Sequence, residues 1–198
     1  MPDFGAVTLY VFRHGECEHN VHGLVAAQND SPLTVHGREQ ARANGALLKE
    51  VAGALDRLDF FASPLHRAAA TMELARAAAG LPREGYFADR RLMEIDFGEH
   101  TWRTWPDIVA DASRDSLWDS DPWNYVHPGG ESLAKLHERV GWFLHTLDRD
   151  AVIVSHAGTM RMIRAHMLGL SQQATMAYHP PNAGLLRIIG GREMYFGG

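Results

Sequence analysis

Cysteine is nearly absent from this chain of 198 residues, and basic residues are too few to give it a positive net charge. Cys17 is the single cysteine, so no disulfide can form within the chain, and a reducing compartment is expected. The formal net charge is -5, which argues against the chain-wide basic field of a nucleic-acid-binding protein. Any phosphate site must therefore come from a local cluster of basic groups.

Long apolar runs and targeting signals are also missing. No stretch approaches the roughly 18 apolar residues of a membrane-spanning helix. The N-terminal sequence has no basic region, and its apolar run is broken at Thr8, which argues against a signal peptide. We therefore expect a cytoplasmic protein without membrane contact. The remaining composition, 45% hydrophobic and 22% charged, is typical of one globular domain, which we expect to span residues 1–198.

Strand-like and helix-like segments alternate along the chain. Apolar runs predict strands at 7–12, 59–62, 151–154 and 185–189, separated by helices at 34–51, 64–80, 131–147 and 157–169. Ser63-Pro64 is interpreted as the helix cap and first helical residue of the second helix. This order predicts an α/β fold, with a largely parallel central sheet and helices on both faces.

Three polar residues follow directly on predicted strands. His14, Ser63 and His156 come at the ends of the first, second and third strands. In an open α/β sheet, ligands bind at the carboxyl ends of the strands. These three positions therefore predict a common site.

The residue types at these strand ends suit phosphoryl transfer. Neutral histidine is a nucleophile, which suggests His14, and the planar fork of Arg13 matches phosphate oxygens. Arg67 falls in the first turn of a predicted helix, where the backbone amides also attract anions. His156 directly precedes another helix N-terminus. For each motif alone, a structural role is the competing interpretation.

A proton donor is also expected, and two carboxyl groups compete for that role. Glu94 and Asp96 lie two residues apart in Leu92-Met93-Glu94-Ile95-Asp96. A phosphate dianion raises the pKa of a carboxyl group beside it, which allows that group to protonate a leaving alcohol. The local sequence does not decide between the two.

The segment at 95–127 is irregular, tryptophan-rich and acidic, and we expect it to form a lid. It holds four of the five tryptophans, which we expect mainly to pack the segment onto the sheet, with stacking on a ring-bearing substrate as the alternative. Two arginines, Arg103 and Arg114, stand against seven acidic residues: Asp96, Glu99, Asp107, Asp111, Asp115, Asp119 and Asp121. If these carboxylates face the site, they repel a bisphosphorylated ligand.

Six motifs in register resemble the histidine phosphatase superfamily, also called the phosphoglycerate-mutase-like family. The matching residues are 13–16 with Asn20, 33–37 with Gln40-Ala41, 63–68 with Thr71, 94–98, 128–132 and 154–158. The resemblance covers nearly the whole chain. One departure is Glu99-His100-Thr101-Trp102, where many family phosphatases have a Trp-Glu-Gly element.

The resemblance implies a role for each matching residue. His14 would form a phosphohistidine, while Arg13, Arg67 and His156 would hold the phosphoryl group. Glu94 would act as general acid and then as base for water. Asn20 and the backbone amide of Ala157 would complete the pocket. The implied activity is hydrolysis of a small phosphate ester without a metal or other cofactor.

Three other functions remain in competition with a phosphatase. A phosphoglycerate mutase would need to bind further anionic groups, which the acidic 95–127 segment disfavours. A non-catalytic binding module would be expected to lack the nucleophile, an arginine or the acid, all of which are present. A zinc site could use the closely spaced His14, Cys17, His19 and His22, but it would leave the other motifs unexplained.

Overall fold

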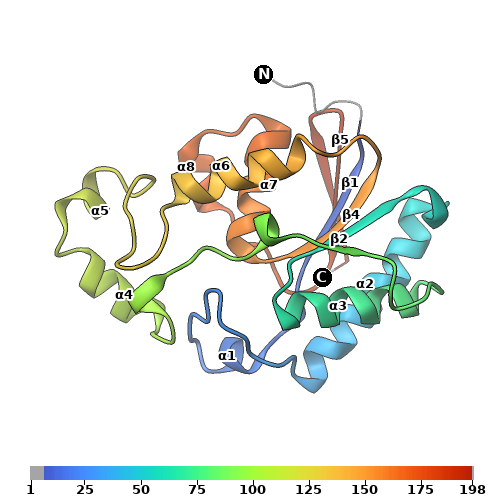
Figure 1. Ribbon diagram of the computed structural model, residues 1–198, viewed down its shortest axis with the longest axis horizontal. Coiled ribbons are helices and arrows are strands. Elements are labelled where there is room, and N and C mark those ends of the chain that lie inside the picture. The colour runs from blue at the N-terminus through green and yellow to red at the C-terminus, as the bar shows by residue number, and fades with distance from the viewer. Residues whose placement is uncertain (1–6, 198) are drawn as a thin grey trace.

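A six-stranded sheet forms the centre of the computed structural model, which describes residues 7–197 (Figure 1). Its strands are β1 (Leu9–Arg13), β2 (Asp59–Ala62), β3 (Phe87–Ala88), β4 (Ala151–Ser155), β5 (Leu185–Ile189) and β6 (Arg192–Phe196). The order across the sheet is β3-β2-β4-β1-β5-β6. Strands β3, β2, β4 and β1 run parallel, whereas β5 is antiparallel to β1 and β6 is antiparallel to β5. The prediction of a largely parallel sheet is confirmed.

Helices cover both faces of this sheet, as predicted. The helices are α1 (Glu18–Val21), α2 (Val35–Ala52), α3 (His66–Ala78), α4 (Trp105–Ala112), α5 (Ser116–Ser120), α6 (Leu133–Leu144), α7 (Ala157–Leu168) and α8 (Gln172–Ala177). In Figure 1, α2 and α3 lie on one side of the strands and α6 and α7 on the other.

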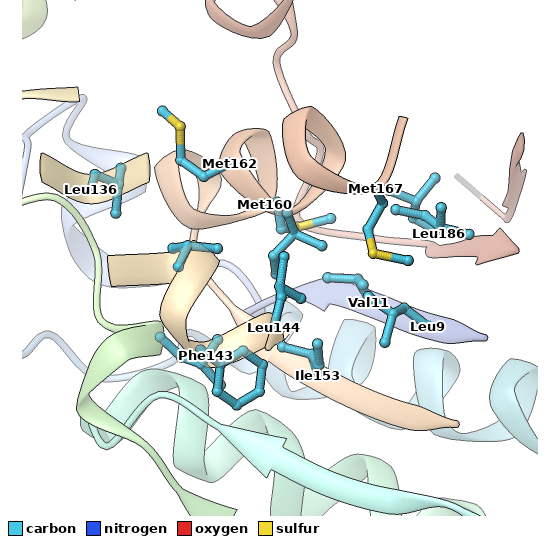
Figure 2. Close-up of a cluster of buried hydrophobic side chains, with 14 of the residues drawn as sticks. Leu9, Val11, Leu136, Phe143, Leu144, Ile153, Met160, Met162, Met167 and Leu186 are labelled. Carbon is cyan, nitrogen blue, oxygen red and sulfur yellow. The ribbon is translucent and has the colours of Figure 1, made fainter. Parts of the chain in front are cut away.

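The alternation of side chains along the strands divides the core in two. On one face Leu9 and Val11 of β1 join Ile153 of β4 and the inner side chains of α6 and α7 (Figure 2). On the other face Tyr10 and Phe12 pack with residues of α2 and α3. Because both faces are buried, β1 and β4 are continuous apolar runs, which is why these strands are evident in the sequence.

Two predicted helix ends can be compared with the structure. Thr34 caps α2, since its hydroxyl accepts the Gly37 N–H at 2.9 Å. The cap predicted for the next helix is wrong, because α3 begins at His66 and Leu65 occupies the N-cap position. Ser63 lies before the cap and bonds a side chain of the site instead. The Asp30 carboxylate accepts the His66 N–H at 2.7 Å.

The segment at 95–127 contains α4 and α5, which stand apart from the sheet at the left of Figure 1. Residues 102 and 103 are tied to the rest of the chain by backbone bonds from Trp102 N to Val25 O and from Val25 N to Arg103 O. The start of the segment is tied to the residues that follow it through Glu131 N, which donates to Asp96 O. These bonds fix the segment beside the carboxyl ends of the strands.

Candidate active site

A pocket of about 520 Å³ lies at the carboxyl ends of β1 and β4. Seven residues singled out in the sequence line it: Arg13, His14, His19, Asn20, Arg67, Glu94 and Ala157. His156 lies directly behind, with its ring centroid 5.2 Å from that of His14. The sheet has therefore brought together residues from four separate motifs.

His14 is held with one ring nitrogen engaged and the other available. Its Nδ1 lies 2.8 Å from the Gly15 carbonyl oxygen, which can only accept a hydrogen bond, so Nδ1 carries the proton. Burial and the neighbouring charges of Arg13 and Arg67 hold the pKa of His14 well below its ordinary value. The ring is therefore neutral at pH 7, and its Nε2 keeps the lone pair that a nucleophile needs.

Close backbone packing fixes the loop that carries His14. A Cβ at Gly15 would lie 2.1 Å from the Gly37 carbonyl oxygen at the start of α2, so no larger residue fits there. The Gly15 N–H donates to the Thr71 hydroxyl at 3.0 Å, and that hydroxyl donates to the Arg67 carbonyl at 2.8 Å. The nucleophile loop is thereby coupled to helix α3, which carries Arg67.

The two arginines of the predicted site are anchored by carbonyl oxygens. Arg67 Nη1 donates to Asn29 O at 2.6 Å and Nη2 donates to Ala27 O at 2.7 Å. Arg13 Nη1 donates to Pro180 O at 3.1 Å. Burial lowers the pKa of both guanidinium groups, although each stays charged because an arginine pKa starts above 12. Their heads are thus oriented before any substrate arrives.

Ser63 sets the orientation of His156. The Ser63 hydroxyl lies 2.7 Å from His156 Nε2, and both side chains are completely buried. Burial, followed by the charge of Arg67, holds the pKa of His156 well below its ordinary value, so this ring is also neutral. The sequence placed Ser63 at a strand end beside the predicted site, but the only bonding role it suggested for this residue was that of a helix cap. Its contact with His156 links residues 93 positions apart.

Buried polar atoms without partners gather around this pocket. Among residues 7–197, seven buried side-chain nitrogens lack a hydrogen-bond partner, and four of them belong to the site: Arg13 Nε, His19 Nδ1, Arg67 Nε and His156 Nδ1. Buried polar groups are normally paired, since an unpaired one costs about 1–3 kcal/mol. A cluster of unpaired nitrogens beside two fixed positive charges suits the binding of an anion.

Glu94 lies on the opposite wall, at the N-terminus of α7. Its carboxylate accepts the Gly158 N–H at 3.1 Å and the Ile95 N–H at 2.9 Å. A Cβ at position 158 would come within 2.4 Å of Glu94 Oε1, so this approach requires glycine there. Asp96 is absent from the pocket lining, and its carboxylate accepts the Gly98 N–H at 2.9 Å. The geometry therefore favours Glu94 over Asp96 as the proton donor.

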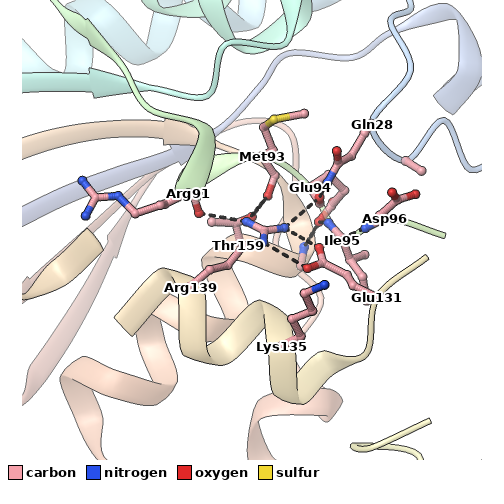
Figure 3. A network of polar contacts seen from close by, with 12 residues as sticks. Gln28, Arg91, Met93, Glu94, Ile95, Asp96, Glu131, Lys135, Arg139 and Thr159 are labelled. Carbon is pink, nitrogen blue, oxygen red and sulfur yellow. Dashed lines mark hydrogen bonds and ion pairs between the residues drawn. The ribbon is translucent and has the colours of Figure 1, made fainter. Parts of the chain in front are cut away.

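An ion pair that the sequence did not reveal holds the backbone of residues 93–96 in place (Figure 3). Arg139 of α6 forms a two-point pair with Glu131, at 3.1 Å from Nε and 2.5 Å from Nη2. The same guanidinium donates to the Met93 carbonyl at 2.8 Å and the Glu94 carbonyl at 2.9 Å. Glu131 also accepts the Asp96 N–H at 3.0 Å. Only the position of Glu131 in a family motif pointed to this pair.

Asn20 and Ala157 both line the pocket. The Asn20 side-chain oxygen accepts the Cys17 N–H at 3.0 Å. Ala157 is the first residue of α7, where backbone amides point out of the helix. A third arginine, Arg161, lies one turn further along α7 and also lines the pocket. It donates from Nε to Tyr178 O at 2.6 Å.

The 95–127 segment contributes aromatic rings to the pocket and none of its carboxylates. Its lining residues are Ile95, Phe97, Trp105, Trp118, Pro122, Tyr125 and His127. The assumption that acidic residues of this segment face the site is therefore wrong. Asp111, for example, pairs with Arg103 at 2.9 Å and Arg114 at 3.0 Å. Aromatic side chains occupy the inner face because burial there stabilises them, whereas carboxylates keep their hydration outside.

The four tryptophans of this segment have different environments. Trp105 and Trp118 line the pocket, with ring centroids 6.2 Å apart. Trp123 is buried in the core cluster beside α6, whereas Trp102 is 45% exposed. The expectation that these rings mainly pack the segment onto the sheet is met by Trp123. Trp105 and Trp118 instead form a wall of the pocket.

Within residues 7–197 there is neither a cluster of metal-binding side chains nor a helix that could span a membrane. No group of three or more His, Cys, Asp or Glu side chains there is arranged to hold a metal ion. Within the same range, every helix is too short or too polar to cross a membrane.

Comparison with known proteins gives a match over most of the chain. The profile of the histidine phosphatase superfamily (branch 1) matches residues 9–194. The adenosylcobalamin/α-ribazole phosphatase of Escherichia coli is 31% identical over 173 residues, which are 84% of this chain and 81% of that protein. The probable phosphoglycerate mutase GpmB of Klebsiella pneumoniae is 30% identical over 187 residues, 91% of this chain and 83% of that protein.

Solved structures show the same fold. The crystal structure of the α-ribazole phosphatase from Shigella flexneri superimposes with a TM-score of 0.76 at 27% identity. The superposition covers 91% of this chain and 89% of that chain. The sequence relatives thus include proteins named as a phosphatase and as a probable mutase.

Proposed function

The chain belongs to the histidine phosphatase superfamily and is a phosphatase, and we propose that it hydrolyses phosphomonoesters through a phosphohistidine at His14. The observation that carries this proposal is the state of the His14 ring. Its Nδ1 is fixed by Gly15 O at 2.8 Å, its pKa is lowered, and its Nε2 is free. Such a ring is a prepared nucleophile.

The reaction then has two steps. His14 Nε2 forms a bond to phosphorus while the bond from phosphorus to the leaving oxygen breaks, and Glu94 gives its proton to the departing alcohol. As the acid of this step, Glu94 must enter it carrying a proton. In the second step Glu94 takes a proton from water, which attacks phosphorus and releases inorganic phosphate from His14.

The charges on the pocket wall suit one phosphoryl dianion. With Glu94 protonated, as the acid step requires, and the histidines counted as neutral, Arg13, Arg67 and Arg161 contribute +3. One bound phosphate dianion leaves +1, so the protein's own groups can stabilise the transferring phosphoryl oxygens without a cation. A second phosphate dianion would leave a net charge of -1. This balance favours hydrolysis over a mutase cycle that uses a bisphosphate.

The wall beyond the phosphoryl site suits a bulky, ring-bearing alcohol. Phe97, Trp105, Trp118 and Tyr125 form a connected group, with neighbouring ring centroids between 5.1 and 6.2 Å apart. At about 520 Å³ the pocket is far larger than a phosphate group needs. We propose that the 95–127 segment acts as a lid that contacts the alcohol part of the substrate.

The direct test of the proposed reaction is the fate of the phosphoryl group. We expect inorganic phosphate to be released from simple monoesters without any bisphosphate activator. A short-lived phosphoenzyme should be trapped by alkaline quenching and lost in acid, as a phosphoramidate is. Rapid quenching with a ³²P-labelled ester, followed by mass spectrometry of the peptide containing His14, measures both.

Two controls accompany this measurement. Chelation with EDTA should leave the rate unchanged, and a loss that zinc or magnesium restores would contradict the proposed charge balance. Conversion of 3-phosphoglycerate to 2-phosphoglycerate, with 2,3-bisphosphoglycerate supplied, should be slow relative to phosphate release. Interconversion faster than release would establish the mutase function instead.

Replacing Trp118 with alanine should weaken binding of ring-bearing esters selectively. We expect kcat/KM for 1-naphthyl phosphate to fall about tenfold, since stacking and apolar burial of one ring contribute roughly 1–2 kcal/mol. The value for ethyl phosphate should change less than twofold. Trp102→Ala is the matched control, because Trp102 lies in the same segment but outside the pocket lining. Equal losses on both esters would contradict the proposed role of this wall.

A further inference from the structure

We propose that His19 donates a hydrogen bond from Nδ1 to a phosphoryl oxygen, as a fourth side chain of the phosphate site beside Arg13, Arg67 and His156. The proposed phosphatase mechanism gives His19 no role in phosphate binding or catalysis. The inference rests on the proposed location of the phosphoryl group, but it does not require that His14 be phosphorylated.

The position of His19 places it in contact with this site. It belongs to the short helix α1, directly after the nucleophile loop, and it lines the same pocket as His14. The two ring centroids are 6.0 Å apart, with the planes inclined by 52°. His19 is only 7% exposed, so its imidazole lies inside the wall of the pocket.

The hydrogen bonding of the imidazole is incomplete in the same way as that of the other phosphate-site groups. His19 Nδ1 is buried and has no hydrogen-bond partner, and the same is true of Arg13 Nε, Arg67 Nε and His156 Nδ1. The three other such nitrogens within residues 7–197 belong to Asn44, Arg164 and Arg187, none of which lines the pocket. His19 Nδ1 thus lacks a partner in the same part of the molecule as the proposed phosphate-site nitrogens.

The backbone of His19 is held in position by hydrogen bonds that do not involve its side chain. Its N–H donates to the Ser31 hydroxyl at 3.1 Å, and its carbonyl accepts the Leu24 N–H at 2.9 Å. The loop is therefore held without help from the imidazole. A purely structural histidine would use its ring nitrogens to bond the protein, and here Nδ1 does not.

The electrostatic environment keeps His19 a neutral donor in the free protein. Burial, followed by the charges of Arg67 and Arg13, lowers the pKa of His19 to about 4. A neutral ring adds no repulsion to the two arginines, and its single proton can occupy Nδ1. His14, the other group facing it, is neutral as well. A bound phosphate oxygen would favour the Nδ1–H tautomer, because only that tautomer can donate from Nδ1.

The experiment measures binding of inorganic phosphate to three variants. His19→Phe removes the donor and keeps an aromatic ring, His19→Gln keeps a donor, and His22→Phe alters an exposed histidine of the same loop. We expect the inhibition constant of phosphate to rise about tenfold or more in His19→Phe, since hydrogen bonds to charged groups are stronger than those between neutral groups. His19→Gln should recover part of the loss, and His22→Phe should match the wild type.

A second measurement reports on the ring itself and uses the unaltered protein. In ¹⁵N NMR spectra, addition of inorganic phosphate should shift His19 Nδ1 to the protonated position. An inhibition constant within twofold of wild type in His19→Phe, or an unchanged Nδ1 resonance at saturating phosphate, would overturn the proposal. If His19→Phe does not fold, the resonance decides alone. Failure to trap a phosphohistidine would contradict the proposed mechanism and leave this binding result intact.

Discussion

His14→Ala is expected to abolish turnover, with kcat reduced roughly 10⁴-fold or more, as when the nucleophile of a covalent mechanism is removed. No other group in the pocket is placed to substitute for it. His156 is the nearest ring, and its Nε2 is engaged by the Ser63 hydroxyl at 2.7 Å. The rate of phosphate release from 4-nitrophenyl phosphate measures the effect.

The folded state should survive this substitution. The His14 imidazole contacts the Gly15 carbonyl and the Cys17 sulfur, at 2.8 and 3.5 Å, and spans no distant elements. His66→Ala is the matched control, since His66 is an exposed histidine on α3 that lies outside the pocket. It should retain full activity. Activity of His14→Ala within tenfold of wild type would exclude the phosphohistidine mechanism.

Glu94→Gln should lower the rate on alkyl phosphates by roughly 10²- to 10⁴-fold, the range of a general acid–base group. The amide oxygen of glutamine can still accept the Gly158 N–H, so the local geometry should be kept while proton transfer is lost. The loss should be smaller for aryl phosphates, because their leaving groups need less protonation. A series of esters with leaving groups of different pKa measures this dependence.

Asp96→Asn is the matched carboxylate control. Asp96 lies two residues away, outside the pocket, and its carboxylate accepts the Gly98 N–H. Its replacement should change the rate little and should not depend on the leaving group. If Asp96→Asn shows the leaving-group dependence and Glu94→Gln does not, the two roles must be exchanged.

One relative is named as a probable mutase. The charge of the pocket therefore bears on whether this site favours hydrolysis or a mutase cycle. The acidic composition of 95–127 predicted repulsion of a second phosphate, but its carboxylates point away from the pocket. The preference for hydrolysis rests instead on the balance of Arg13, Arg67 and Arg161 against one dianion, and on the aromatic wall. Composition gives the number of charges in a segment, whereas their effect on a ligand depends on which face they occupy.

The sequence by itself determined the four central strands of the sheet, whereas the edge strands β3 and β6 appeared only in the structure. Strands β1 and β4 are buried on both faces, so they are short, continuous apolar runs that can be found without a structure. His14 and His156 follow these strands directly, and parallel strands end at one edge of the sheet. Local pattern and simple topology therefore placed both residues at one edge of the sheet, where their ring centroids lie 5.2 Å apart.

Tertiary structure alone decided how these residues are prepared for chemistry. The tautomer of His14 follows from a carbonyl contact, the orientation of His156 from Ser63, and the position of Glu94 from Arg139. Each depends on geometry to within a few tenths of an ångström. Two of the three join residues 45 and 93 positions apart, so no local pattern encodes them. The same holds for the inner face of 95–127, since packing against the rest of the fold selects which side chains face the pocket.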